Sequence, residues 1–293
     1  MRIGWIGTGV MGASMAGHLL AAGHELCVYT RNRRKAVSLL DSGAEWADSP
    51  AAVAACTEAV FTIVGYPHDV EAVYLGEDGI LAAGAACRIT VDMTTSDPAL
   101  AIRIADRARE HGMLALDAPV SGGDVGARNG TLAIMAGGDD TAFAEMRPIF
   151  ELMGENIQLM GGPGAGQHTK MCNQILIAGT MIGVCESLLY AARQGLDEKA
   201  VIGIIGKGAA SSWSINTLGP RIADGNFDPG FYVEHFIKDM AIALRESAAC
   251  GLSLPGLALV HQLYVAVQAQ GHGRLGTQAL MLGLRTLNGQ TAS

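Results

Sequence analysis

The stretch Gly164–Leu196, GAGQHTKMCNQILIAGTMIGVCESLLYAARQGL, decides how the rest of the chain is organised. It opens with a glycine-rich turn and then has a helical pattern for about 28 residues, or roughly 42 Å. Apolar residues lie on every side, and a helix that is apolar all round is either buried or spans a membrane. The longest uncharged run, Met171–Cys185, is too short and too often interrupted for a span. We therefore expect a buried core helix and no membrane segment.

Two polar residues stand out in this helix. Lys170 and Asn173 are three positions apart, so they share one face near its start. A lysine at the positive end of the helix dipole is unfavourable unless something compensates, and an anionic ligand would do so. The alternative is that Lys170 extends from the helix end into solvent, which is usual for an isolated lysine. The rest of the chain favours the ligand.

Composition limits the class of protein. A chain of 293 residues, 49% hydrophobic and 16% charged, suits two domains. The net charge of -8 argues against non-specific nucleic-acid binding. The six cysteines are scattered, with no CxxC pair and no Cys/His cluster, so we expect free thiols and no metal site. Because no signal peptide precedes the first strand, we expect a cytoplasmic protein.

The first residues carry a nucleotide-binding pattern. A short apolar strand, Met1–Ile6, leads into GTGVMG at residues 7–12, and a helical run follows to Ala22. This is the GxGxxG pattern between a strand and a helix, where it places a dinucleotide pyrophosphate on the helix N-terminus. The alternative is a tight turn without a ligand. The residues expected to bind the cofactor here are Gly7, Thr8, Gly9, Val10, Met11 and Gly12.

The end of the second expected strand, Glu25–Thr30, bears on the choice of cofactor. NAD sites use an acidic residue here to bind the ribose, whereas NADP sites replace it and supply arginine. The chain reads YTRNRRK at residues 29–35 and has no acid before Asp41, so NADP is favoured over NAD. Arg31 could bind the 2′-phosphate, with Thr30 and Asn32 beside it. A solvated helix start is the alternative, although cations are disfavoured there.

Strands and helices then alternate, which predicts a doubly wound, mainly parallel sheet. Ligands bind such sheets at the carboxyl ends of the strands, so Gly65, Tyr66 and Thr95 are expected to face the cofactor. The expected strands are 44–46, 59–64, 88–93, 114–118, 130–136 and 156–159, and the expected helices are 50–56, 68–75, 97–111 and 141–152.

The segment Ser121-Gly122-Gly123 follows a strand and could present backbone N–H groups to an anion. A plain loop is the alternative. From Gly166 onward only helical patterns occur, at residues 166–194, 197–206, 214–223, 233–251, 255–271 and 277–287. We therefore expect an α/β Rossmann domain at residues 1–163 and an all-α domain at 164–293, joined by an interdomain helix at about 166–194.

Four separated motifs of the chain resemble those of the β-hydroxyacid dehydrogenase family and occur in the same order. The members of this family are relatives of 6-phosphogluconate dehydrogenase. That family includes 3-hydroxyisobutyrate dehydrogenase, tartronate semialdehyde reductase and glyoxylate/succinic semialdehyde reductases. The motifs are IGWIGTGVMG at residues 3–12, DAPVSGG at 117–123, GAGQHTKMCNQ at 164–174, and Lys238-Asp239 followed by Ala243. From its helical context alone, Lys238 would be expected on a solvated face.

The resemblance implies a role for each matched position. Lys170 matches the catalytic lysine, which acts as general acid/base in hydride transfer between NADP(H), or NAD(H), and a small β-hydroxy acid or semialdehyde. Thr95 and Lys238 match positions near the nicotinamide, and Phe231 and Asp239 match positions that shape the substrate pocket. Ser121, Gly122, Gly123 and Asn173 match groups that hold the substrate's carboxylate and hydroxyl.

Two departures from the family pattern bear on the cofactor. The chain has Gly65-Tyr66-Pro67 where many members have Met-Leu-Pro, and Thr30-Arg31-Asn32 where NADP-using members often have Asn-Arg-Thr. Two alternatives stay open: an imine reductase of the same architecture, in which Asp or Tyr commonly replaces the lysine, and a non-catalytic nucleotide-sensing module. Relatives pair through their α domains, so a homodimer or homotetramer is expected.

Overall fold

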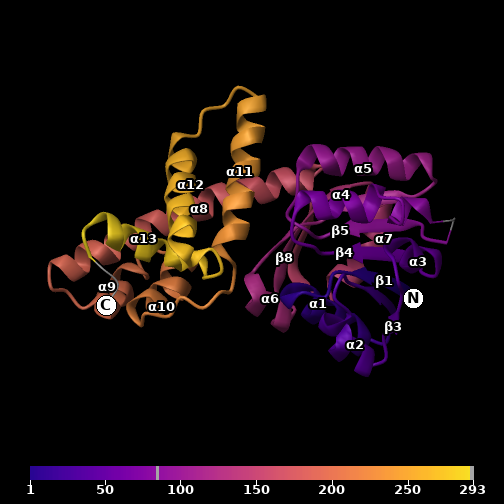
Figure 1. The fold of residues 1–293 in the computed structure, drawn as a ribbon, viewed down its shortest axis with the longest axis horizontal. Helices are drawn as coiled ribbons and strands as arrows, with labels where there is room; N and C mark the ends of the chain where they lie inside the picture. The colour runs from indigo at the N-terminus through magenta and orange to yellow at the C-terminus, as the bar shows by residue number, and fades with distance from the viewer. Residues whose placement is uncertain (84–85, 291–293) are drawn as a thin grey trace. The chain divides into compact units, whose positions relative to one another are not determined.

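The computed structural model describes residues 1–83 and 86–290. They divide into two compact units, with the division inside helix α8 (Ala165–Arg193), after Lys170. The domain boundaries expected from the sequence, 1–163 and 164–293, stay a prediction. Figure 1 shows a first unit of strands and helices and a second unit of helices. This is the Rossmann-like domain and helical region that the sequence predicts.

The first unit is built on one sheet with the strand order β3-β2-β1-β4-β5-β6-β8-β7, and β9 pairs with β8. Strands β1 to β6 are parallel, whereas β8 is antiparallel to β6 and β7. The sheet is therefore mainly parallel, as predicted. The strands are β1 (Arg2–Ile6), β2 (Glu25–Tyr29), β3 (Glu45–Trp46), β4 (Ala59–Thr62), β5 (Ile89–Asp92), β6 (Leu114–Asp117), β7 (Val120–Ser121), β8 (Leu132–Gly138) and β9 (Gly154–Leu159).

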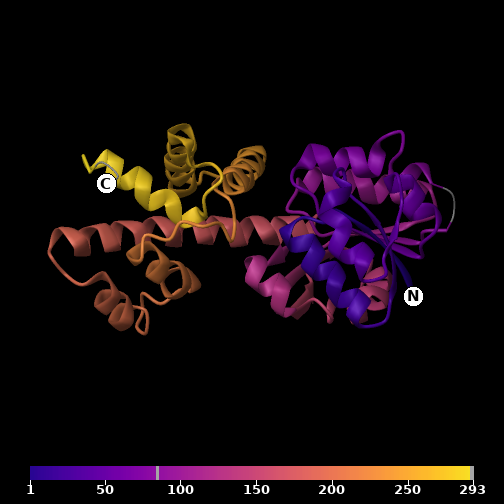
Figure 2. The same ribbon diagram turned by 60° about the horizontal axis from the view of Figure 1, so that its bottom comes forward.

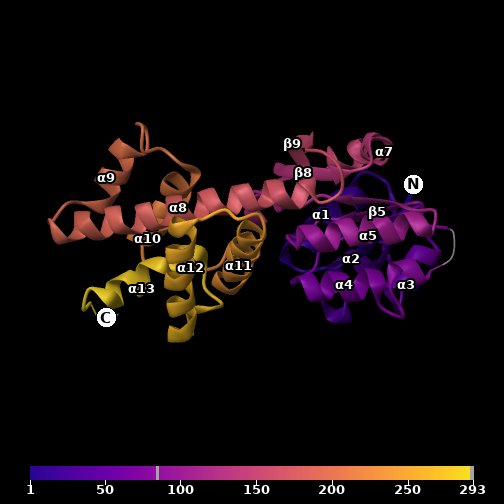
Figure 3. The ribbon, with the colours of Figure 1, turned by 90° about the horizontal axis from the view of Figure 1, so that it is seen from above.

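Helices cover both faces of this sheet (Figures 1 and 3). Successive strand residues point to opposite faces, so Trp5 joins the hydrophobic cluster with α1, α2 and α7, and Ile6 joins the cluster with α3, α4 and α5. The strands are apolar on both faces for that reason. The helices of this unit are α1 (Val10–Ala21), α2 (Val37–Asp41), α3 (Pro50–Ala55), α4 (Pro67–Leu75), α5 (Pro98–Glu110), α6 (Gly123–Asn129) and α7 (Asp140–Phe150).

The segment after β6 differs from the expected loop. It forms β7 and then α6, in a stretch, GDVGARN, whose glycines and polar residues have weak helix propensity. Gly122 and Gly123 have φ angles of 134° and 64°, which residues with side chains rarely adopt. These two glycines turn the chain directly from the strand into the helix.

The second unit is helical and has its own core, with Phe236 packed edge-on against Tyr264 at 5.1 Å between ring centroids. Residues 268–272 form a π-helical turn that contains Gly271 at a φ of 89°, so the regular helix ends before the residue 271 expected from the sequence. Figure 2 shows α11 and α12 side by side. The helices are α9 (Glu198–Ile205), α10 (Gly219–Ala223), α11 (Val233–Ala249), α12 (Pro255–Val267) and α13 (Leu280–Leu287).

Helix α8 is buried on one face only. Ala178, Met181 and Cys185 are fully buried, but the side chains of Leu176 and Tyr190 are 69% and 67% exposed. The expectation of a helix buried all round is therefore wrong for a single chain, because the elements of one chain cover only one apolar stripe. By length and hydropathy α8 also meets the criterion for a membrane span, a test that core helices of soluble proteins pass as well.

The start of α8 is held by the carboxylate of Asp117, at the end of β6. The N–H of Gly164 donates to Oδ1 and the N–H of Gln167 donates to Oδ2, both at 2.8 Å. The first N–H groups of a helix lack partners within the helix, and this one carboxylate accepts two hydrogen bonds there. A side chain at Gly166 would clash with the carbonyl oxygen of Asp117, so the glycine allows the close approach.

Burial raises the pKa of the Asp117 carboxyl from 3.8 to about 6, although the N–H groups of Gly164 and Gln167 act to lower it. An acid with a raised pKa in the folded state contributes its full stability below its unfolded pKa and loses it as the pH rises through the folded pKa. Between pH 4 and pH 7.5 the wild type should therefore lose up to about 3 kcal/mol relative to Asp117→Asn. Urea unfolding of both proteins at each pH measures this difference. A difference independent of pH would contradict the assignment.

Candidate active site

The glycine-rich turn after β1 has the shape that a dinucleotide requires. Gly7 has a φ of 97°, and a side chain there would clash with the carbonyl oxygen of Ile63. A side chain at Gly12 would clash with the carbonyl oxygen of Gly7, so both of these glycines serve packing. A Cβ at Gly9 would meet nothing within 4 Å. The space beside Gly9 is thus open where a pyrophosphate would approach the backbone.

Two further features of this turn fit a bound nucleotide. The hydroxyl of Thr8 is buried, with the residue 3% exposed, and has no hydrogen-bond partner among the residues that the structure describes. Gly9 caps α1 without a side-chain hydrogen bond, and the first turn of α1 carries no acidic residue. The first N–H groups of this helix therefore keep their positive potential for an anionic group.

The basic run after β2 is divided among several partners. Arg31 Nη1 pairs with Oδ1 of Asp69, on α4, at 2.8 Å, and its side chain is 78% exposed. The guanidinium of Arg33 lies over the ring of Trp46 at 5.1 Å, and the side chain of Asn32 accepts from the N–H of Arg34. Arg31 is therefore held at the end of β2 by a buried carboxylate that the sequence analysis did not single out.

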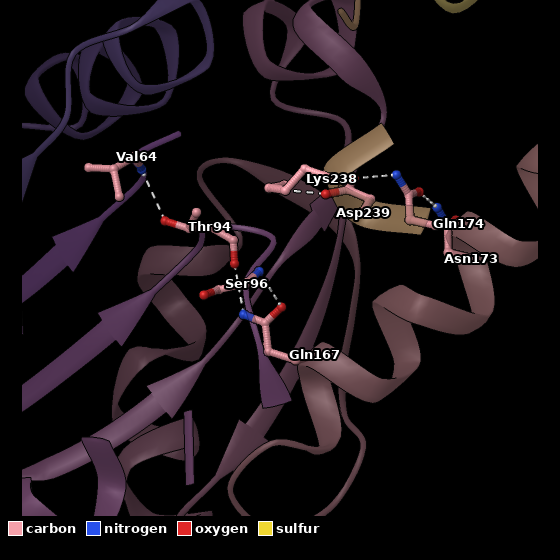
Figure 4. Close-up of polar contacts among 8 residues, drawn as sticks. All are labelled: Val64, Thr94, Ser96, Gln167, Asn173, Gln174, Lys238 and Asp239. Atoms are coloured by element: carbon pink, nitrogen blue, oxygen red, sulfur yellow. Dashed lines mark hydrogen bonds and ion pairs between the residues drawn. The ribbon is translucent and has the colours of Figure 1, made fainter. Parts of the chain in front are cut away.

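The loops after β4 and β5 are connected by side chains. The hydroxyl of Thr94 accepts from the N–H of Val64 at 3.0 Å (Figure 4). The side chain of Gln167, on α8, binds the second loop from both ends, because Nε2 donates to the Thr94 carbonyl at 2.7 Å and Oε1 accepts from the Ser96 N–H at 2.9 Å. These two bonds flank Thr95, so Gln167 determines where that residue lies.

Gln167 is a site residue that the sequence analysis missed. Its signal was a polar side chain at the start of an apolar helix, and it is fully buried in the structure. Lys170 follows it by three residues on α8 and is only 6% exposed. The alternative that Lys170 extends into solvent is therefore excluded. Lys170 belongs to the same unit as Thr95 and the segment Ser121–Gly123.

The second unit contains the other predicted site residues. Asp239, on α11, is fully buried, and its carboxylate lies 3.0 Å from Lys238 Nζ and accepts from Gln174 Nε2 at 2.6 Å (Figure 4). Asn173 Nδ2 donates to Gln174 Oε1 at 2.7 Å. The ring of Phe231 packs edge-on against Phe236 at 5.9 Å. Hydrogen bonds of Gln174 therefore connect Asn173 to Asp239, which pairs with Lys238. The sequence had predicted no role for Gln174.

Comparisons with known proteins agree with this organisation. Residues 2–162 match the family model described as the NAD binding domain of 6-phosphogluconate dehydrogenase. Residues 164–283 match the model described as NAD-binding of NADP-dependent 3-hydroxyisobutyrate dehydrogenase. Together the two models cover both units of the chain.

Individual relatives match over nearly the whole length. A probable 3-hydroxyisobutyrate dehydrogenase-like 1 protein of Arabidopsis thaliana is 52% identical, over 98% of this chain and 86% of the relative. The 2-hydroxy-3-oxopropionate reductase of Escherichia coli is 39% identical, over 98% of each chain. The structure of a Mycobacterium tuberculosis 3-hydroxyisobutyrate dehydrogenase with L-serine has a TM-score of 0.86 at 30% identity, covering 97% of this chain and 99% of the other.

The fold and the glycine-rich turn define an oxidoreductase that binds a nicotinamide cofactor, NAD or NADP. Within that class the chain belongs to the β-hydroxyacid dehydrogenase family. The resemblance inferred from the four sequence motifs is thereby confirmed.

Gly9 and Gly12 of the turn should respond differently to substitution. In Gly9→Ala the added methyl group meets open space, so the melting temperature should stay within about 1 °C while cofactor affinity falls by about tenfold or more, because the methyl group occupies the pyrophosphate position. Gly12→Ala should lower stability itself, since its methyl group clashes with backbone. Thermal unfolding and calorimetric cofactor titration separate the two effects. Equal loss of stability in both variants would contradict this division of roles.

Proposed function

We propose that the protein transfers a hydride between NADP(H) and a small β-hydroxy acid or its semialdehyde, with Lys170 as the general acid/base. The observation that carries the proposal is the burial of Lys170 on a helix whose start is held by Asp117 and by Gln167. A lysine is seldom buried unless its charge has a partner or a use, so its burial on this helix points to a function. The known dehydrogenases and reductases among the relatives support the same reaction class.

The residues of the chain divide the work of this reaction. The nicotinamide cofactor supplies the hydride in reduction and accepts it in oxidation. In reduction the ammonium of Lys170 donates a proton to the substrate's carbonyl oxygen, and in oxidation the neutral amine takes the hydroxyl proton. Ser121 and the backbone of Gly122 and Gly123 hold the substrate's carboxylate, and Asn173 orients the reacting oxygen. Holding both ends of a small substrate is what brings the reacting carbon into line.

The preference for NADP is part of the proposal. No acidic residue lies between the end of β2 and Asp41, and Arg31 stands at that end with its side chain largely exposed. Asp69 holds one side of the guanidinium, which orients the planar group. An arginine placed in this way can bind a 2′-phosphate through two parallel hydrogen bonds.

The oligomeric state and location are also proposals. The apolar residues exposed on α8, Leu176 and Tyr190, support pairing of two or four copies through the helical unit. Light scattering tests this, and the mass of a single chain at micromolar concentration would contradict it.

The free thiols of Cys56, Cys172 and Cys250 are exposed, which supports a reducing compartment such as the cytoplasm. Cell fractionation tests this location.

Lys170→Ala should lower kcat by about 100- to 10,000-fold, because the proton donor is removed. Cofactor affinity, measured by calorimetry, should stay within about twofold of the wild type. The assay follows nicotinamide absorbance with semialdehydes, 2-oxo acids, hydroxy acids and a set of imines. Retained activity in Lys170→Ala would overturn the assigned acid/base.

The same assay on the wild-type protein tests the alternative functions. Turnover of imines alone would place the protein with the imine reductases, and tight cofactor binding without any turnover would indicate a nucleotide-sensing module.

Arg31→Ala should raise the KM for NADP by about tenfold or more and leave the KM for NAD nearly unchanged, since only NADP carries the 2′-phosphate. The effect should shrink at high salt, where exposed charges are screened. Arg34→Ala, in the same basic run, is the matched control and should change neither value by more than about twofold. An equal loss for both cofactors would mean that Arg31 acts on the fold of the turn and not on the phosphate.

A further inference from the structure

Two cysteines that have no part in the proposed reaction lie on the same face of the sheet. Cys27 on β2 pairs in register with Gly4 on β1, so the side-chain positions of both residues point to one face. Helix α3 covers that face, because a Cβ at Gly4 would clash with the side chain of Val53. Cys56 ends α3, and its N–H donates to the Val53 carbonyl at 3.3 Å. The strand and the helix that packs on it therefore bring Cys27 and Cys56 together.

The side chains of Cys27 and Cys56 interact, and they have different surroundings. Cys27 is only 3% exposed, whereas Cys56 is exposed. Burial, and after it the contact with Cys56, raises the pKa of the Cys27 thiol from 9.0 to about 12. Cys27 therefore keeps its proton at neutral pH, and this proton is available to the sulfur of Cys56.

A cation lies beside the exposed member of the pair. Arg2, on β1, forms an ion pair with Glu45 on β3, and its guanidinium also interacts with the side chain of Cys56. The thiolate and not the thiol is the nucleophile in cysteine chemistry, and a neighbouring arginine favours the thiolate. Cys56 thus combines access to solvent, a cation and a second thiol within reach.

We propose that Cys56 and Cys27 form a peroxide-reactive thiol pair, in which Cys56 is oxidised first and Cys27 then closes a disulfide with it. The Cys56 thiolate attacks one oxygen of a hydroperoxide, the O–O bond breaks, and the sulfur becomes a sulfenic acid while an alkoxide or hydroxide leaves. The sulfur of Cys27 next attacks the sulfenic sulfur, and the hydroxyl group leaves with the Cys27 proton as water. The two thiols lose two electrons, which the peroxide gains.

The buried thiol gives the pair a protective function. A sulfenic acid that meets more peroxide is oxidised to sulfinic acid, which is irreversible in most proteins. A disulfide stops the oxidation at a stage that a reducing compartment reverses. Cys27 is placed to make that disulfide because it contacts Cys56 before any oxidation takes place.

Mass spectrometry of peptides from the full-length protein tests the pair. The reduced protein is treated with a slight excess of hydrogen peroxide, its remaining thiols are blocked with iodoacetamide, and it is digested without reductant. In the wild type we expect a cross-linked product of the Cys27 and Cys56 peptides, about 2 Da lighter than the two reduced peptides together. Dithiothreitol should separate this product. Cys250→Ser is the matched control, because it removes another exposed cysteine and should leave the cross-link unchanged.

Two variants test the order of the steps. In Cys27→Ser the second thiol is absent, so Cys56 should be trapped by dimedone as sulfenic acid and then become sulfinic acid, about 32 Da heavier than the thiol. In Cys56→Ser the thiol of Cys27 should stay reduced, because it is buried and keeps its proton. Cys27→Ala replaces Cys27→Ser if the buried hydroxyl lowers the yield of folded protein.

The outcomes separate the pair from general oxidation of exposed thiols. Recovery of Cys27 and Cys56 as blocked thiols in the wild type, at a peroxide dose that oxidises Cys250, would overturn the proposal. Oxidation of Cys27 in Cys56→Ser as fast as in the wild type would also overturn it, since the buried thiol would then react without Cys56.

Discussion

The carboxylate of Asp117 is the constraint on which the rest of the first unit's site depends. It accepts hydrogen bonds from the N–H groups of Gly164 and Gln167, and so it joins the end of β6 to the start of α8. The same turn of α8 places the Gln167 side chain against the backbone on both sides of Thr95. A buried acid therefore determines where the helix begins, and the helix in turn determines where Lys170 lies. The pKa of Asp117 is raised because the carboxyl group is buried.

The buried polar residues of α8 follow one helical stripe. Gln167, Lys170 and Gln174 are three and four residues apart, the spacing that keeps side chains on one face. All three are at most 6% exposed, and the neighbouring residues Met171, Ala178 and Met181 are buried and apolar. Polar groups in such surroundings are retained only with partners, and for the two glutamines those partners are backbone of the β5 loop and the carboxylate of Asp239. The polar residues of α8 therefore lie on the same face of the helix as its buried apolar residues.

The predictable part of the fold came from periodicity. Parallel strands that are buried on both faces have continuous apolar sequences, and a turn bounds each of them here. The order of strands and helices was therefore predicted closely from the sequence. The short helix α6 was not predicted, because its glycines have weak helix propensity. The positive φ angles of Gly122 and Gly123 explain how the chain turns into this helix. The complete burial of α8 was predicted wrongly, since an apolar sequence does not say whether the same chain or another one covers each face.

The sequence by itself determined the family, the nicotinamide cofactor and the position of Lys170, because spaced motifs and local periodicity are properties of neighbouring residues. The contacts of Asp117, Asp69, Gln167 and Gln174 were decided only by the tertiary structure. Each of these side chains acts on a partner dozens of residues away, as Gln174 does on Asp239 and Gln167 on Thr94 and Ser96. Contacts between segments so distant along the chain leave no local pattern. They exist only once the sheet and the helices have brought those segments together.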